Sequence, residues 1–440
     1  MKLSPLQQYG IVTANYWAFT LTDGALRMLV VFHFHQLGYT TLEIAFLFLF
    51  YELFGVLTNL YGGWIGARYG LRLTLWVGTL LQILALLMLM PVAASWPKLL
   101  SVIYVMTAQA ISGIAKDLNK MSAKSAIKTV VSETPEDQQQ GQQQLFKWVA
   151  ILTGSKNALK GVGFFLGGVL LTAFGFNAAV GWMAAGLALA FLLTLVLPGE
   201  IGKMKSKPAF SSLFSKSQGI NVLSLARFFL FGARDVWFVV ALPVFLEASL
   251  GWSFWEIGGF LGLWVIGYGI VQGSAPGLRR LWGQTTSPGA SAVQFWSALL
   301  TAIPALIAVA LWRQVDVAVA ITAGLAAFGV VFAMNSSIHS YMVLAYTDAE
   351  SVSLNVGFYY MANAAGRLVG TLLSGAVFML GRTEAAGMQA CLWASSLLVL
   401  LSWFSSLRNF RLGPNSEFLL NIAALVGIQT PASRDFLLNG

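Results

Sequence analysis

Long apolar stretches recur along the whole chain, and short polar or glycine-rich segments separate them. Twelve stretches have about 20 residues or more, the length that an α-helix needs to cross a bilayer core of about 30 Å. Their approximate cores are 9–35, 42–66, 73–95, 100–128, 146–173, 177–197, 220–247, 254–278, 291–312, 316–346, 353–380 and 387–407. The pattern predicts an all-α integral membrane protein with twelve transmembrane helices.

The long polar segment 198–219 divides this series into two sets of six. It is rich in proline, glycine and lysine, which is typical of a solvated linker. We therefore predict an N-terminal six-helix bundle over residues 1–197, a cytoplasmic linker over 198–219, a C-terminal six-helix bundle over 220–407 and a cytoplasmic tail over 408–440.

Basic residues are distributed unequally between the loops of the two sides. The side that holds the linker and both chain ends carries Arg68, Arg72, Lys203, Lys205, Lys207, Lys216, Arg279, Arg280, Arg408 and Arg411, and the other side carries only Lys98, Arg313 and Arg382. By the positive-inside rule, both termini are expected in the cytoplasm. The first apolar segment has no small-residue cleavage site, so we expect it to be a retained helix and not a signal peptide.

Composition agrees with a membrane protein, because 57% of the 440 residues are hydrophobic and 10% are charged. The net charge of +9 would suggest a nucleic-acid partner in a soluble protein, but here the basic residues lie in loops and inside spans. The single cysteine, Cys391, excludes an intrachain disulfide and a cysteine-based metal cluster. No nucleophile elbow or metal-ligand spacing is visible, so we expect no enzyme, no cofactor and no metal.

Four lysines interrupt the predicted span 100–128 at intervals of four residues, and therefore share one helical face: Lys116, Lys120, Lys124 and Lys128. A charge near the bilayer centre costs about 2.5 kcal/mol or more, so such a side chain normally faces the protein interior or a water-filled cavity. Lys124 and Lys128 can instead extend to an aqueous interface. We predict that Lys116 and Lys120 line a polar cavity.

Other spans carry charges with helical spacing. Asp23 and Arg27 lie four residues apart in the first span and could neutralise each other. Lys156 and Lys160 share a face of the fifth span, whereas Gly154, Gly161 and Gly168 form a second stripe that predicts close helix packing. The other interior candidates are Glu52, Asp117, Arg227, Arg234, Asp235, His339, Tyr359, Asn363 and Arg367. For His339, a satisfied interior histidine is the commoner explanation, and a proton-handling role stays open.

The expected interior contains more cations than acids. The cations are Arg27, Lys116, Lys120, Lys124, Lys156, Lys160, Arg227, Arg234 and Arg367, and the acids are Asp23, Glu52, Asp117 and Asp235. Buried charges persist mainly when they are paired, so the excess predicts a small, multiply charged anion as ligand. Arginine binds phosphate or arsenate oxygens in a bidentate manner, and lysine acts as a point charge.

The loop after the second span, Gly63 to Arg72, resembles the signature loop of the major facilitator superfamily. Gly63, Arg68, Gly70 and Arg72 match that pattern, and Ala67 stands where an acidic residue is usual. The resemblance implies a major facilitator fold, in which two pseudo-symmetric six-helix bundles rock around a central site.

Five further segments resemble the family of organoarsenical efflux permeases known as ArsJ: residues 15–29, 112–128, 153–168, 231–243 and 356–364. This resemblance implies an exporter in the bacterial inner membrane that acts in arsenate resistance. Its cargo would be 1-arseno-3-phosphoglycerate, which glyceraldehyde-3-phosphate dehydrogenase forms from arsenate. That dehydrogenase is therefore the expected functional partner.

The candidate site follows from both arguments. We expect Arg27 and Arg234 to clamp one anionic end across the bundle interface, and four lysines to hold the other: Lys116, Lys120, Lys156 and Lys160. Tyr359, Asn363 and Arg367 would complete the site. Asp23, Glu52, Asp117, Asp235 and His339 would pair with charges or carry protons, and inward exchange of phosphate is the other possible coupling.

Three alternatives remain open at this point. An exchanger for other organic phosphate anions would have the same cation-lined cavity. A membrane-embedded enzyme and a transporter-like sensor without flux are the other two.

Overall fold

The computed structural model describes residues 3–39, 47–92, 95–130, 138–199, 217–348 and 351–407, and all regular elements in these ranges are helical. They are α1 (Pro5–Gln36), α3 (Leu49–Tyr69), α4 (Leu71–Leu89), α5 (Lys98–Ala126), the 3-10 turn η1 (Ile127–Thr129), α6 (Gln138–Thr194), α7 (Gln218–Phe238), α8 (Ala241–Leu250), α9 (Phe254–Leu281), α10 (Ala290–Trp312), α11 (Val317–Ala345), α12 (Val352–Phe378) and α13 (Glu384–Leu407). Most of the predicted linker and the whole predicted tail lie outside the described residues.

Eight of the described helical segments are long and apolar enough to cross a membrane. One of these is α6, which contains two predicted spans because the chain turns at Gly175, where φ is 72°. Another of the eight candidate spans comprises both α7 and α8. The helices α1, α3 and α12 have sufficient length but a more polar composition, and the polar residues they carry include the candidate site residues. The all-α fold with twelve helical crossings is confirmed.

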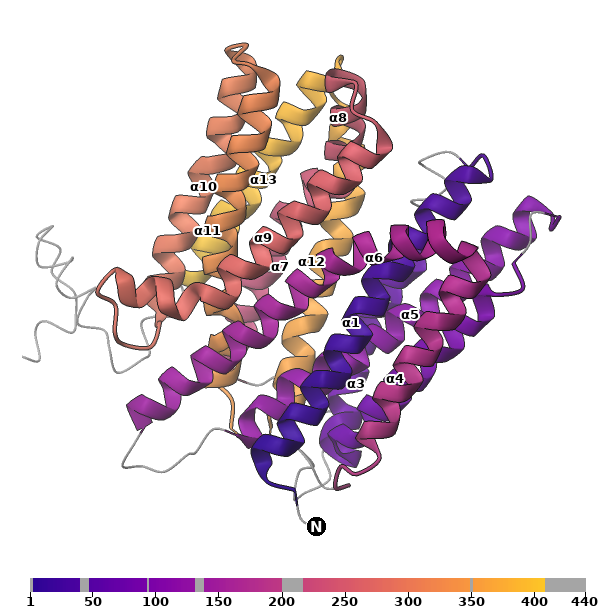
Figure 1. The fold of residues 1–440 in the computed structure, drawn as a ribbon. Coiled ribbons are helices and arrows are strands. Elements are labelled where there is room, and N and C mark those ends of the chain that lie inside the picture. Colours follow the sequence, from indigo (N-terminus) through magenta and orange to yellow (C-terminus); the bar gives the residue numbers. More distant parts are fainter. Residues whose placement is uncertain are drawn as a thin grey trace, which may run out of the picture.

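Helices from the two halves of the chain gather on different sides of the molecule (Figure 1). In the first half, α6 packs on α1, and α5 packs on α3 and α4. In the second half, α7 packs on α12 and α13, and α10 packs on α11 and α13. The halves meet mainly where α6 lies along α9 and where α3 lies along α12.

Glycines allow the close approach between the halves. A Cβ on Gly161 of α6 would lie 2.5 Å from Ile266 of α9, and Gly154 faces the backbone of Gly273. On the other contact, a Cβ on Gly63 of α3 would lie 2.7 Å from the carbonyl oxygen of Ser353. The predicted small-residue stripe of the fifth span is therefore confirmed as a packing surface.

Many large apolar side chains point outward from the described helices. Leu189, Val196, Leu263 and Leu306 are each more than 60% exposed. Such a surface is unsuitable for water but suitable for lipid, which has no preference for polar groups. The polar side chains discussed below lie instead between the helices.

The loop between α3 and α4 consists of Gly70 alone. Its φ of 93° favours glycine, and its N–H donates to the carbonyl oxygen of Gly66 at 2.9 Å. Arg72 then donates from Nη1 to the carbonyl oxygen of Leu197 at 2.7 Å, which ties the turn to the end of α6. The turn lies at the end of the molecule where α1 begins and α13 ends, which we call the terminus face.

Candidate functional site

Charged side chains from six helices meet at the boundary between the two halves. We call this set the central network: Asp23 and Arg27 on α1, Tyr51 and Glu52 on α3, Lys116, Asp117 and Lys120 on α5, Lys160 on α6, Arg234 and Asp235 on α7, and Arg367 on α12. Charges inside a membrane domain normally mark a binding site or a transport path.

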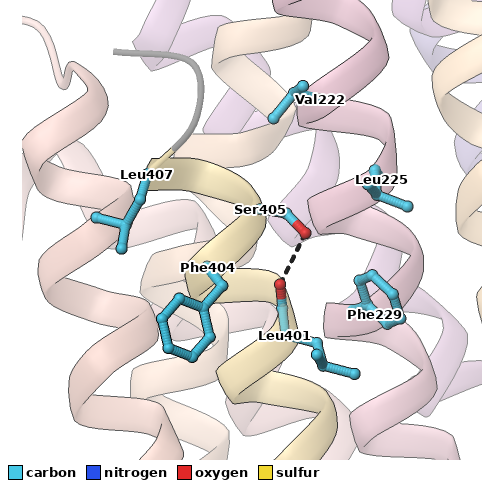
Figure 2. Close-up of a pocket in the computed structure, with 7 residues that line it drawn as sticks. All are labelled: Val222, Leu225, Phe229, Leu401, Phe404, Ser405 and Leu407. Atoms are coloured by element: carbon cyan, nitrogen blue, oxygen red, sulfur yellow. Dashed lines mark hydrogen bonds between the residues drawn. The ribbon is translucent and has the colours of Figure 1, made fainter. Parts of the chain in front are cut away.

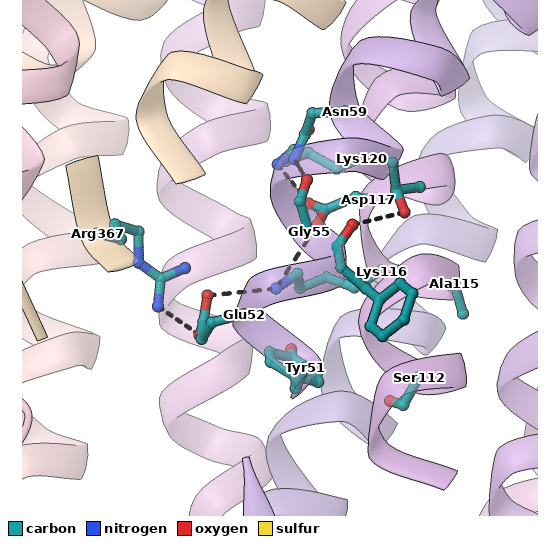
Figure 3. A network of polar contacts seen from close by, with 12 residues as sticks. Tyr51, Glu52, Gly55, Asn59, Ser112, Ala115, Lys116, Asp117, Lys120 and Arg367 are labelled. Carbon is teal, nitrogen blue, oxygen red and sulfur yellow. Dashed lines mark hydrogen bonds and ion pairs between the residues drawn. The ribbon is translucent and has the colours of Figure 1, made fainter. Parts of the chain in front are cut away.

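Glu52 contacts cations from three helices, and Figure 3 shows two of them, Arg367 and Lys116. Its Oε1 lies 2.7 Å from Nη2 of Arg367 and 3.6 Å from Nη2 of Arg27. Its Oε2 lies 3.8 Å from Nζ of Lys116. Because Arg367 belongs to the second half of the chain, this carboxylate joins the two halves.

Arg367 uses both edges of its guanidinium group. Besides the bond to Glu52, its Nε donates to Oδ2 of Asp235 at 3.0 Å. The other oxygen of Asp235 accepts from Nε of Arg234 at 2.6 Å. A planar guanidinium fork presents its donors to two carboxylates in a fixed geometry, whereas a lysine acts as a point charge.

Asp23 is bound by two other helices. Its Oδ2 accepts from Nζ of Lys160 at 3.0 Å, and its Oδ1 accepts from the hydroxyl of Tyr51 at 2.5 Å. The possible pairing of Asp23 with Arg27 along α1 is therefore corrected, since Arg27 contacts Glu52 instead. Tertiary packing offers both side chains partners from other helices.

Asp117 contacts two of the lysines that share one face of α5, Lys116 and Lys120. Its Oδ1 lies 2.5 Å from Nζ of Lys120, and its Oδ2 lies 3.8 Å from Nζ of Lys116. Space for this carboxylate depends on Gly55 of α3, because a Cβ there would lie 2.6 Å from Oδ2 (Figure 3).

We expect Gly55→Ala to reduce transport about ten-fold or more, because the added methyl group displaces Asp117 and costs about 1–3 kcal/mol through overpacking. Uptake of labelled substrate into proteoliposomes measures the effect. Gly186→Ala is the matched control, because nothing lies within 4 Å of a Cβ at that glycine of the same half. Equal transport by both variants would contradict this role of Gly55.

Three interior cations have no acidic partner in the described part of the chain: Lys124, Lys156 and Arg227. Lys124 donates to the hydroxyl of Thr153, and Lys156 donates to Oδ1 of Asn157 at 3.1 Å. Arg227 donates from Nη1 to Oγ of Ser336 at 3.0 Å.

All nine cations and all four acids that the sequence analysis counted as interior are buried or half-buried. The excess of cations is therefore inside the molecule.

The remaining candidates line the same boundary from the second half. The ring of Tyr359 is fully buried and lies 5.2 Å from Cζ of Arg227. Asn363 is buried, and its Nδ2 has no hydrogen-bond partner among the described residues. Neither ring nitrogen of the fully buried His339 has one. The role of His339 stays a prediction.

The predicted clamp differs in its details. Arg27 and Arg234 belong to one network, but Glu52, Arg367 and Asp235 connect them in sequence. Each of the two arginines already contacts a carboxylate. The role of these residues in binding stays a prediction.

Tyr51 is a member of the network that the sequence analysis missed. Nζ of Lys116 lies 3.8 Å from its ring centroid, in a cation–π contact, and its hydroxyl binds Asp23. A signal existed, because Tyr51, Gly55 and Asn59 are spaced by four residues and form one polar stripe of the second span.

A groove of about 710 Å³ lies elsewhere, between α7 and α13 (Figure 2). Its lining is Val222, Leu225, Phe229, Leu401, Phe404, Ser405 and Leu407. The hydroxyl of Ser405 already donates to the carbonyl oxygen of Leu401 at 2.7 Å. Without a charged side chain, this groove is unsuited to an anion.

Comparison with known proteins agrees with this arrangement. The sequence profile of the Major Facilitator Superfamily matches residues 11–371. No curated protein sequence matches the chain.

Two solved structures illustrate the similarity of fold. A bacterial homologue of the iron transporter ferroportin, in an outward-facing state, has a TM-score of 0.67 and 15% identity, over 90% of this chain and 98% of that chain. The human organic anion transporter MFSD10 (TETRAN) has a TM-score of 0.69 and 16% identity, over 91% of this chain and 99% of that chain. With its helical fold and the profile match, the chain belongs to the Major Facilitator Superfamily and is a multi-pass membrane transporter, not an enzyme.

Proposed function

We propose that this transporter exports a small organic anion with two anionic groups by alternating access through the central network. The observation that carries the proposal is the excess of cations at the boundary of the two halves, nine against four acids. Uncompensated buried charge is unfavourable, so a bound anion would stabilise the site. Sugars and cationic drugs would not supply this compensation.

The network suggests how such an anion would act on the two halves. Glu52 and Asp235 contact the arginines, and phosphate or arsenate oxygens would compete for the same donors. Replacement of Glu52 at Arg367 would break the bond between α3 and α12. Binding would thereby favour the movement of one bundle relative to the other.

The preferred cargo is the organoarsenical 1-arseno-3-phosphoglycerate, with export across the bacterial inner membrane and both termini in the cytoplasm. The segments that resemble ArsJ permeases supply much of the network. Residues 15–29 contain Asp23 and Arg27, 112–128 contain the lysine stripe of α5, and 231–243 contain Arg234 and Asp235. These segments are distant in sequence but contribute residues to the central network.

An exchanger for other organic phosphate anions is the second candidate, since it would use the same surplus of cations. One transporter with this fold carries organic anions, so the fold can accommodate such cargo. Dependence on the dehydrogenase distinguishes the two candidates, because only the organoarsenical requires an enzyme to form it from arsenate.

The test is arsenate accumulation in arsenic-sensitive bacterial cells that express the chain, with and without glyceraldehyde-3-phosphate dehydrogenase. We expect accumulation to fall only when both proteins are present. Arg234→Gln should lose this effect while the protein remains in the membrane, because the site loses a cation that would bind one anionic end. Arg313→Gln, at an exposed arginine that follows α10, is the matched control.

Two results would contradict the proposal in different ways. If the chain alone changed the uptake of ordinary organic phosphates, and the dehydrogenase made no difference, the cargo would be an organic phosphate. If Arg234→Gln exported normally, Arg234 would have no part in substrate binding.

A further inference from the structure

Two cations without an acidic partner among the described residues, Lys124 and Arg227, belong to opposite halves of the protein and are connected through polar side chains of α6, α9 and α11. Lys124 is 3% exposed on α5, and Arg227 is 2% exposed on α7. Lys124 contacts Thr153 of α6, and Asn157, one helical turn further along α6, donates to Oε1 of Gln272 at 2.6 Å. Nε2 of Gln272 donates at 3.2 Å to Oγ of Ser336, which also accepts from Arg227. Two cations without an acidic partner in the described part of the chain thus share one buried polar region, which is unfavourable without an anion.

The two residues lie at a common depth, closer to the terminus face than the central network. On α5, which runs toward that face, Lys124 follows Lys120 by one helical turn, about 6 Å. On α7, which begins at that face, Arg227 precedes Arg234 by seven residues, about 10 Å. Both helices therefore carry a cation between the central network and the terminus face.

Further polar atoms at this depth lack partners. Nε of Arg227 has no hydrogen-bond partner among the described residues, and neither ring nitrogen of His339 has one. His339 is fully buried and lies one helical turn from Ser336, which accepts a hydrogen bond from Arg227. Tyr359 lies beside Arg227, and Asn363, with its free Nδ2, lies one turn along α12 toward Arg367. Hydrogen-bond donors are therefore available here for an anionic group, whose oxygens accept hydrogen bonds.

Access to this level is closed in the present conformation. The side chains of Arg27 and Arg367 are 28% and 24% exposed, whereas Lys124 and Arg227 are almost fully buried. Packing of Gly63 and Gly357 against each other brings α3 and α12 together near the terminus face. An anion would have to pass from the central network toward that face, or enter when the face opens.

We propose that Lys124 and Arg227 form a second anion-binding subsite, which receives a phosphate-like or carboxylate group on the path between the central network and the terminus face. The inference rests on the proposed anion transport, since it assigns a second station to the same path. The group is either the second anionic end of the substrate or a free phosphate ion that moves in exchange.

The first arm of the test measures stability. Replacing an unpaired buried cation with an apolar side chain of similar length should stabilise the ligand-free protein. We therefore expect Lys124→Met to raise the melting temperature of the full chain in detergent, and to reduce the further rise that 3-phosphoglycerate or inorganic phosphate produces. A purely structural lysine would show a lower melting temperature. Lys147→Met, at an exposed lysine of α6, is the matched control.

The second arm measures binding to the full chain in nanodiscs with three probes: inorganic phosphate, glycerol 3-phosphate and 3-phosphoglycerate. Lys124→Met and Arg227→Gln should each weaken one class of probe about ten-fold or more, because each removes a charge-assisted hydrogen bond. Arg227→Lys keeps the charge, and is the second variant at that position if Arg227→Gln does not fold.

The pattern of the losses identifies the source of the group. Weaker binding of 3-phosphoglycerate, with glycerol 3-phosphate unchanged, would assign the subsite to the second anionic end of the substrate. Weaker binding of inorganic phosphate alone would assign it to the exchanged ion.

Two patterns would overturn the subsite. One is wild-type affinity for all three probes in the folded variants, and the other is an equal loss for all three, which would indicate only a lower positive potential. If the wild-type protein itself bound none of the probes, the proposed anion transport would fail together with the subsite.

Discussion

Arg367→Gln should reduce transport at least about 30-fold. Loss of one partner from a buried, hydrogen-bonded charge pair across an interface costs about 2–5 kcal/mol, and Arg367 makes two such bonds, to Glu52 and Asp235. Glutamine also removes one cation from the proposed anion site. The measurement is uptake of labelled organic anion into proteoliposomes, at equal amounts of reconstituted protein.

Two further variants separate the causes of this loss. Arg367→Lys keeps the charge but loses the rigid fork that fits both carboxylates, so we expect intermediate transport. In the double variant Arg367→Gln with Glu52→Gln, the unpaired carboxylate is also removed. We expect recovery of protein stability without recovery of transport. Full transport by the double variant would show that Arg367 only neutralises Glu52.

Gly357→Val should prevent the terminus face from closing, and should thereby reduce transport at least about ten-fold. A Cβ at Gly357 would lie 2.7 Å from the carbonyl oxygen of Asn59 and 2.9 Å from Cα of Gly63, and neither backbone can move alone. Overpacking would destabilise by about 1–3 kcal/mol only the conformation in which α3 and α12 are in contact. The equilibrium would then shift toward the opposite conformation.

Thiol labelling of a cysteine introduced at Ser353 measures this shift, because Ser353 is 1% exposed in the closed conformation. The native Cys391 is fully buried and adds little background. We expect faster labelling in the Gly357→Val background and unchanged labelling with Gly375→Ala, a glycine of α12 whose Cβ would meet nothing within 4 Å. Unchanged labelling in both backgrounds would contradict the role of Gly357 in closure.

Much of the fold could be predicted because its signals are local. The length of each apolar stretch predicts a crossing, and the glycine stripe of residues 154–168 predicts a packing face that the structure places against α9. The short turn at Gly70 also follows from its own sequence. The break between α7 and α8 within one predicted span, and the turn of α6 at Gly175, change only the boundaries.

The site could be predicted as a set of residues but not as a set of bonds. Helical spacing placed Asp23 within reach of Arg27, yet Asp23 binds Lys160, which is 137 residues away. Glu52 and Arg367 are 315 residues apart and share a bond. Tyr51 was missed because hydrophobicity alone does not distinguish an interior aromatic ring from one that faces lipid.

The sequence by itself determined the membrane class, the number of helical crossings, and the excess of interior cations, since these depend on length, composition and the helical period. Only the tertiary structure decided which cation meets which acid, and which cations have no acidic partner among the described residues. Coulomb interactions and hydrogen bonds act over a few ångströms, so they depend on how distant helices are placed side by side. Lys124 and Arg227 are the clearest case, because each is an ordinary charged residue in sequence, and only the fold buries both in one polar region with no acidic partner in the described part of the chain.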